Sequence, residues 1–124
     1  MAKRLSRNTF IMDKPPTIRS YAAVAGKKEG DGPLGRHFDQ VYQDPYFGQD
    51  TWEKAESELL RLTVMKALEK GKLRCEDINY MFAGDLINQC IGTTFGIRDL
   101  NIPFFGIYGA CSTMAEGLLL ASLL

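Results

Sequence analysis

The feature that most constrains the fold is the stretch 103–124, in which a short strand leads through small residues into an apolar helix. Its first part, Phe104 to Tyr108, is an aromatic and β-branched run that is typical of a buried strand. Gly109 and Ala110 allow a sharp turn before Cys111. Cys111 is therefore expected where a strand turns into a helix, and the positive end of the helix dipole favours a thiolate there.

The segment from Met114 to Leu124 has one charge, Glu116, among apolar and small residues. A helix that is apolar on all sides is expected to be buried on all sides, so this one is predicted in the middle of a large domain. The apolar run is shorter than the roughly 20 residues that a membrane span needs. No helix-ending residue follows it. We therefore expect the chain to be the first part of a longer one.

The cysteines and the single histidine limit the chemistry that the chain can carry. Cys75, Cys90 and Cys111 are widely spaced, and His37 is the only histidine, so neither a disulfide framework nor a metal site is predicted. We expect no cofactor, and a reducing compartment. For Cys111 a buried structural thiol is the alternative interpretation. Cys75 is interpreted as incidental, Cys90 as core, and His37 as a surface loop residue outside the site.

The composition is that of a soluble globular protein, with 45% hydrophobic and 24% charged residues and no formal net charge. A surface that binds nucleic acid or anionic membranes without sequence preference needs a basic excess, which the chain as a whole lacks. The first residues include Lys3, Arg4 and Arg7 but no continuous apolar run, so no signal peptide is predicted.

Three regions are predicted along the chain. Residues 1–25 are expected to be extended, with a first strand at 9–12 and a second at 21–25. Residues 26–50 are rich in glycine and aromatic residues, which indicates a long loop. Such a loop is either packed on the domain or a mobile excursion. Residues 51–124 are expected to form the first part of an α/β domain that is incomplete at Leu124.

The third region alternates helices and strands. An amphipathic helix is predicted after Asp50, which with Glu53 resembles a capping box, and it is expected to end at a left-handed Gly71. Its charged residues, including Glu56, are interpreted as a solvated face. The further expected elements are a strand at 78–83, a glycine-interrupted helix at 88–98, a strand at 104–108 and a helix at 112–124. This order predicts an α/β layer around parallel strands.

Two chemically useful residues fall directly after predicted strands. In open α/β sheets, ligands bind beyond the carboxyl ends of the strands, where Asp85 and Cys111 are expected. This shared placement is the reason to assign both to one site. Asp85 has a second interpretation, as a cap of the following helix. Asn88 and Gln89 are polar groups near the same strand end that can bind a ligand or neighbouring backbone.

Several runs together resemble a known family. They are 27–35 (KKEGDGPLG), 38–39 (FD), 52–56 (WEKAE), 82–89 (FAGDLINQ) and the segment around Cys111. Gly-Ala-Cys-Ser-Thr at 109–113, with the apolar helix after it, is similar to the nucleophile segment of the thiolase and ketoacyl synthase superfamily. Taken together, the runs resemble more closely the stage V sporulation protein AD family of spore-forming bacteria.

The resemblance implies a thiolase-like α/β fold of two similar halves, of which this chain holds most of the first. It implies a homodimer, and binding of dipicolinic acid with support of its uptake into the developing spore, together with membrane proteins of the same operon. The location implied is peripheral, at the cytoplasmic face of the spore inner membrane. No nucleic-acid partner is expected.

The ligand-binding residues that we predict on this basis are Cys111, Asp85, Asn88 and Ser112. The superfamily's catalytic histidines would lie in later sequence, so a binding role is favoured over catalysis. The alternative is a thiolase-like acyltransferase with Cys111 as its nucleophile. An inert scaffold for assembly at the spore membrane is a third, weaker interpretation.

Overall fold

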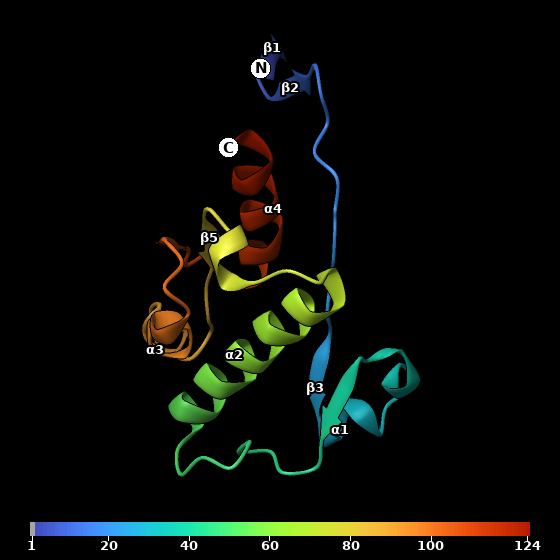
Figure 1. Cartoon of the computed structure of the whole chain (residues 1–124), viewed down its shortest axis with the longest axis vertical. Coiled ribbons are helices and arrows are strands. Elements are labelled where there is room, and N and C mark those ends of the chain that lie inside the picture. Colours follow the sequence, from blue (N-terminus) through green and yellow to red (C-terminus); the bar gives the residue numbers. More distant parts are fainter. Residues whose placement is uncertain (1) are drawn as a thin grey trace.

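Figure 1 shows a computed structural model of the chain, which describes residues 2–124 and so leaves the first residue of the expected segment 1–25 outside the description. The strands, in chain order, are β1 (Ala2–Ser6), β2 (Thr9–Met12), β3 (Val24–Gly26), β4 (Gln40–Tyr42), β5 (Met81–Ala83) and β6 (Phe104–Gly106). The α-helices are α1 (Lys27–Gly30), α2 (Trp52–Gly71), α3 (Ile91–Ile97) and α4 (Thr113–Leu123). Short 3-10 turns are η1 (Gly35–His37), η2 (Cys75–Asp77), η3 (Arg98–Leu100) and η4 (Ala110–Ser112).

The described strands form three separate pairs rather than one layer. β1 and β2 are antiparallel, whereas β3 pairs with β4 and β5 pairs with β6 in parallel. The predicted α/β class and the parallel pairing are therefore confirmed, while the single sheet expected from the alternating order is not formed by these residues. Phe82 lies opposite Phe105 in the β5–β6 pair, and their rings stack with centroids 5.0 Å apart.

Helix α2 crosses the centre of the molecule, and its ends differ from those expected (Figure 1). The cap is Thr51, whose hydroxyl oxygen accepts a hydrogen bond from Lys54 N at 3.3 Å. Asp50 instead accepts from the Lys54 ammonium at 3.1 Å, so the prediction of an Asp50 cap is wrong. The left-handed residue at the other end is Lys72, with φ of 53°, and Gly71 is still helical.

Residues 26–50, which we expected as a loop, contain α1, η1 and β4. β4 pairs with β3. Asp39, the residue before β4, connects this region to α2 and to Ala23. The Asp39 carboxylate accepts hydrogen bonds from Lys70 Nζ at 2.5 Å and from Ala23 N at 2.8 Å. These bonds thus hold the region on α2 and on the residue that precedes β3.

Helix α3 packs on α2 through glycine. A Cβ atom on Gly96 would lie 2.5 Å from the carbonyl oxygen of Ser57, and one on Gly92 would lie 2.9 Å from Glu56 Oε2. Thr93, between these two glycines, is fully buried. The glycines that weaken the sequence signal for this helix are therefore the residues that let it approach α2 closely.

Helix α4 lies against β5, where a Cβ on Gly117 would meet the carbonyl oxygen of Phe82 at an ordinary 3.7 Å. None of the residues of α4 is buried in this structure. Burial of α4 on all sides, which we expect within a larger domain, therefore stays a prediction. Only one side of the helix faces the two-stranded sheet. The large apolar side chains of α4 that stay exposed are Met114, Leu118, Leu119 and Leu123.

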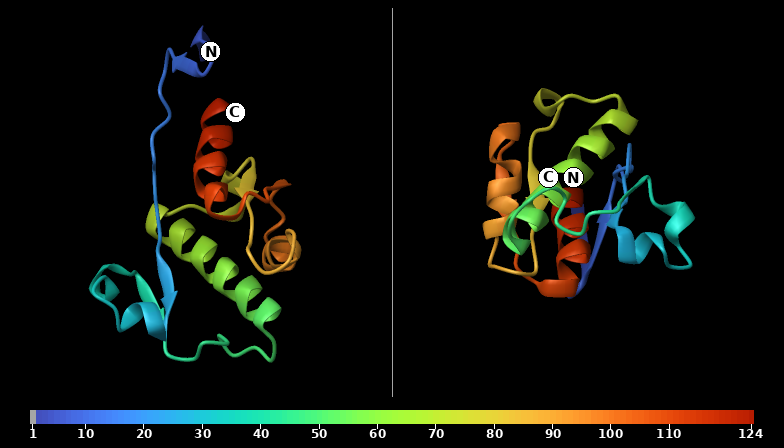
Figure 2. Two further views of the ribbon diagram at one scale, coloured as in Figure 1. Left: turned by 180° about the vertical axis from the view of Figure 1, so that it is seen from behind. Right: turned by 90° about the horizontal axis from the view of Figure 1, so that it is seen from below.

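The β1–β2 hairpin stands apart from the other elements. An extended segment without helix or strand, residues 13–23, connects it to β3, and we call this segment the strap (Figures 1 and 2). The buried apolar residues lie elsewhere, around α2, α3 and the two parallel strand pairs: Ala25, Ala55, Leu68, Ile97, Ile102 and Ile107. Within the described residues, no helix combines the length and the apolar character that crossing a membrane requires.

Candidate functional site

The two residues paired on sequence grounds, Asp85 and Cys111, line one groove of about 630 Å³. One wall is β5 with the segment that follows it, residues 80–86. The other wall is the turn before α4 and one side of that helix, formed by Ala110, Cys111, Thr113, Met114, Gly117, Leu118 and Ala121. The groove therefore runs along β5 and α4, and Asp85 and Cys111 line it where the chain leaves the carboxyl ends of β5 and β6, as expected for ligand sites in α/β proteins.

Cys111 lies in η4 and is exposed, in contrast to the buried structural thiol of the alternative interpretation. The preceding Ala110 has φ of 49°, a left-handed conformation that costs a residue with a Cβ about 1–2 kcal/mol. Backbone amides make two of the hydrogen bonds that hold the turn: Gly109 N donates to Thr113 Oγ1 at 3.1 Å, and Ser112 N donates to Gly109 O at 3.0 Å. The backbone therefore presents the sulfur at the start of α4.

Asp85 is buried, with 6% of its surface exposed, and its carboxylate accepts hydrogen bonds from the start of α3. Oδ1 accepts a hydrogen bond from Cys90 N at 3.0 Å. Oδ2 accepts from Thr93 N at 2.7 Å and from the Thr93 hydroxyl at 2.8 Å. These bonds satisfy amides at the start of α3, which is what the capping interpretation expects. A direct role of Asp85 in ligand binding stays a prediction.

Asn88 and Ser112 are not among the residues that line the groove. The Ser112 hydroxyl donates to Gly109 O at 2.6 Å and so belongs to the turn before α4. The carbonyl oxygen of Asn88 accepts from Ile91 N at 3.0 Å, in the turn that precedes α3. Their predicted roles in ligand binding stay predictions, and their hydrogen bonds here are structural.

Glu56 is a residue that the sequence interpretation missed, because we assigned it to the solvated face of α2. Its Oε1 accepts a hydrogen bond from Leu86 N at 3.0 Å, directly after Asp85. Its Oε2 is buried and has no hydrogen-bond partner among the described residues. Glu56 and Asp85 thus hold the groove wall from two sides, one through α2 and one through α3. Nothing in the helical spacing of the charges distinguishes Glu56 from its exposed neighbours.

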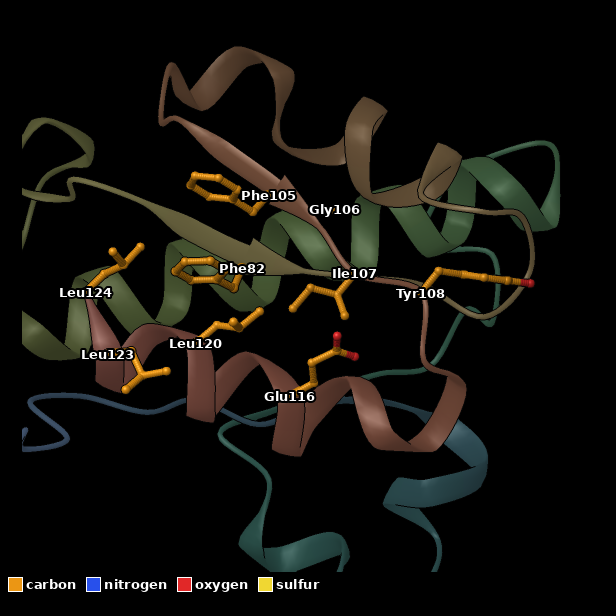
Figure 3. Close-up of a pocket in the computed structure, with 9 residues that line it drawn as sticks. All are labelled: Phe82, Phe105, Gly106, Ile107, Tyr108, Glu116, Leu120, Leu123 and Leu124. Atoms are coloured by element: carbon orange, nitrogen blue, oxygen red, sulfur yellow. The ribbon is translucent and has the colours of Figure 1, made fainter. Parts of the chain in front are cut away.

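A second groove of about 470 Å³ lies on the other side of α4. Figure 3 shows it between Phe82 and Phe105 of the strands, with Ile107 directly after β6, and the helix residues Leu120 and Leu123. Glu116 supplies the only charged side chain of its lining. The two grooves share Phe82 of β5, so α4 separates a groove that contains Cys111 from one that is almost entirely apolar.

The other candidate residues lie away from the Cys111 groove lining. Cys90, which we interpreted as core, is half-buried, and its thiol donates to Ile107 O at 3.6 Å. His37 lies in η1, where its Nε2 accepts a hydrogen bond from Arg36 Nε at 3.3 Å. Among the described residues, no group of side chains is arranged to hold a metal ion.

The fold and groove define a mixed α/β protein with a cysteine presented beyond the ends of two parallel strands. Comparison with known proteins is more specific. The family model for stage V sporulation protein AD (SpoVAD) matches residues 6–124, so the chain belongs to this family. Stage V sporulation protein AD of Bacillus subtilis (strain 168) is 40% identical over 122 residues, which is 98% of this chain and 36% of that relative. The chain thus spans about a third of the length of the curated relative that it matches.

Proposed function

We propose that this protein binds dipicolinic acid and supports its uptake into the developing spore, through the groove that contains Cys111. The observation that carries the proposal is the exposed position of Cys111 at the start of α4, in a chain that belongs to a sporulation family. We further propose a thiolase-like fold of two similar halves, with this chain forming most of the first half. The role is binding rather than catalysis.

The chemistry of the groove suits an aromatic dicarboxylate. Its volume of about 630 Å³ lies within the range of about 300–1,000 Å³ found for small-molecule sites. Met81, Phe82, Met114 and Leu118 supply apolar surface for an aromatic ring. The amino-terminal end of α4 carries positive partial charge and attracts a carboxylate. In this arrangement Asp85 and Glu56 shape the wall, and the ligand's carboxylates lie at the Cys111 end.

Isothermal calorimetry on the protein at its full natural length tests this proposal. We expect a saturable heat with dipicolinate and a weaker one with pyridine-2-carboxylate, which lacks the second carboxylate. Equal binding of the two compounds would argue against recognition of both carboxylates. The absence of any heat with dipicolinate would reject the proposed ligand.

The alternative function is acyl transfer, and the exposure of Cys111 at the positive end of a helix favours it. In that reaction the thiolate sulfur attacks the carbonyl carbon of an acyl thioester. A new S–acyl bond forms on Cys111 as the C–S bond of the thioester breaks, and the sulfur of the carrier leaves as a thiolate with the electron pair of that bond and takes up a proton from water. Such a nucleophile needs a neighbouring base, and His37 is absent from the groove lining. Mass spectrometry after incubation with an acyl-coenzyme A tests this function, because an unmodified Cys111 peptide would reject it.

We also propose a homodimer that works with membrane proteins of the same operon at the cytoplasmic face of the spore inner membrane. This assembly is what the resemblance to the family implies. Light scattering on the purified protein tests the dimer, since a mass equal to one chain would contradict it.

A further inference from the structure

The amino-terminal hairpin has no apolar core of its own and none against the other elements. Every described side chain from residue 3 to residue 19 is exposed, apart from the half-buried Met12. Figures 1 and 2 show the hairpin at the end of the strap, beyond the helices. The turn is held locally, because the Arg4 guanidinium donates to Ser6 O at 3.0 Å and to Arg7 O at 2.7 Å.

The hairpin and strap carry a basic excess that the composition of the whole chain hides. The chain has no formal net charge, yet residues 2–23 contain five basic side chains and one acidic one, Asp13. The basic residues are Lys3, Arg4, Arg7, Lys14 and Arg19. A cluster of four to eight basic residues is attracted to a membrane surface that contains anionic lipids.

Large apolar side chains accompany these charges. The strand register places Lys3 opposite Ile11 and Arg4 opposite Phe10, so on each face of the hairpin a basic residue lies opposite a large apolar one. Phe10 and Ile11 are 51% and 49% exposed, and Leu5 is 59% exposed. At a membrane interface such side chains enter the acyl region while the basic side chains reach up to the lipid phosphates. Binding to nucleic acid would leave Leu5 and Ile11 in water.

We propose that the β1–β2 hairpin and the strap up to Arg19 dock on anionic lipid. The occupant of this surface is the phosphate and glycerol region of a negatively charged bilayer. An isolated two-stranded hairpin is marginally stable in water, and contact with lipid stabilises it. The inference rests on the proposed membrane location, and it is independent of dipicolinate binding because no hairpin residue lines the Cys111 groove.

Vesicle flotation with the full-length protein tests this inference. The probes are vesicles of phosphatidylcholine alone and vesicles that also contain phosphatidylglycerol. We expect binding only to the anionic vesicles, and weaker binding as the salt concentration rises. Lys3→Glu with Arg7→Glu should lower the apparent affinity at least about tenfold, since each basic residue near the surface contributes about fivefold. Phe10→Ser should weaken binding without changing its salt dependence.

The matched control is Lys28→Glu with Arg36→Glu, which makes the same charge change at exposed positions outside the hairpin. It should keep the affinity within about twofold, as expected for charges away from the docking surface. Equal loss in control and hairpin variants, equal binding to both vesicle types, or binding to duplex DNA but not to vesicles would overturn the inference. Calorimetry with dipicolinate on the hairpin variants separates a failure here from a failure of the proposed ligand.

Discussion

Thr93 donates two hydrogen bonds to the same oxygen of Asp85, one from its backbone amide at 2.7 Å and one from its hydroxyl at 2.8 Å. Thr93 is fully buried in α3, and Asp85 follows β5. The pair therefore ties the helix to the end of the strand. Because residue 85 also lines the Cys111 groove, this connection fixes one groove wall in place.

Replacing Asp85 by asparagine should destabilise the protein. The carboxylate uses both oxygens as acceptors, one for Cys90 N and the other for Thr93. Asparagine keeps only one acceptor oxygen, so the donors on one side lose their partner and face an NH2 group. We expect a loss of about 2–3 kcal/mol in the free energy of unfolding, measured by urea denaturation. Thr93→Val, which removes only the hydroxyl donor, should cost about 1–2 kcal/mol. The exposed Asp99→Asn is the control, and a loss as large as that of Asp85→Asn would contradict the account.

Two glycines on helices should respond in opposite ways to alanine. Gly96→Ala places a Cβ 2.5 Å from the backbone oxygen of Ser57, so α3 must move away from α2. We expect a loss of about 1–3 kcal/mol, as for other overpacked sites. Gly117→Ala meets its nearest atom at 3.7 Å, and its higher helix propensity should raise stability by up to about 1 kcal/mol. Thermal unfolding of both variants checks this, and equal effects would show that the α2–α3 contact is looser than described.

Lys72→Gly should stabilise the carboxyl end of α2. Lys72 has φ of 53°, a conformation that glycine adopts without the steric cost of a Cβ. We expect a gain of about 0.5–1 kcal/mol in the free energy of unfolding. Glu69→Gly is the opposing control, because it places glycine within the helix at an exposed position, where it should destabilise. A destabilised Lys72→Gly variant would contradict the described end of the helix.

The link between Asp39 and Lys70 predicts a loss of stability in acid. The hydrogen bond from Lys70, followed by that from Ala23 N, lowers the pKa of Asp39 below its ordinary value of about 3.8. The ionised carboxylate thus favours the folded state. This contribution is present above about pH 3.8 and is lost as the pH falls through the lower pKa of the folded protein. Unfolding curves of the parent and Asp39→Asn should differ at neutral pH and approach each other in acid. A constant difference across this range would contradict the link.

Much of the local structure could be predicted from sequence because it follows from periodicity. The amphipathic pattern predicted α2, and the strands that follow it were placed around the correct residues. Helix ends were less predictable, because Asp50 and Thr51 are both good caps and only the backbone decides between them. Likewise Lys72 takes the left-handed position one residue after Gly71, which remains within α2.

The site was predictable where it depends on strand order and not where it depends on packing. Asp85 and Cys111 share a groove because parallel strands bring their carboxyl ends together. Glu56 reaches the same wall from α2, and this tertiary contact could not be predicted from the spacing of charges along the helix. The exposure of α4 also depends on packing, since only one side of that apolar helix meets the two-stranded sheet formed here.

Binding of dipicolinate to a protein with a blocked groove tests the central claim most directly. Cys111→Trp places a large ring at the start of α4, whereas Glu76→Trp makes a comparable change at an exposed position outside the groove. In calorimetry on the full-length protein, we predict that Cys111→Trp abolishes the heat of dipicolinate binding and that Glu76→Trp leaves it unchanged. Normal dipicolinate binding by a folded Cys111→Trp variant would contradict the proposal that the ligand occupies this groove.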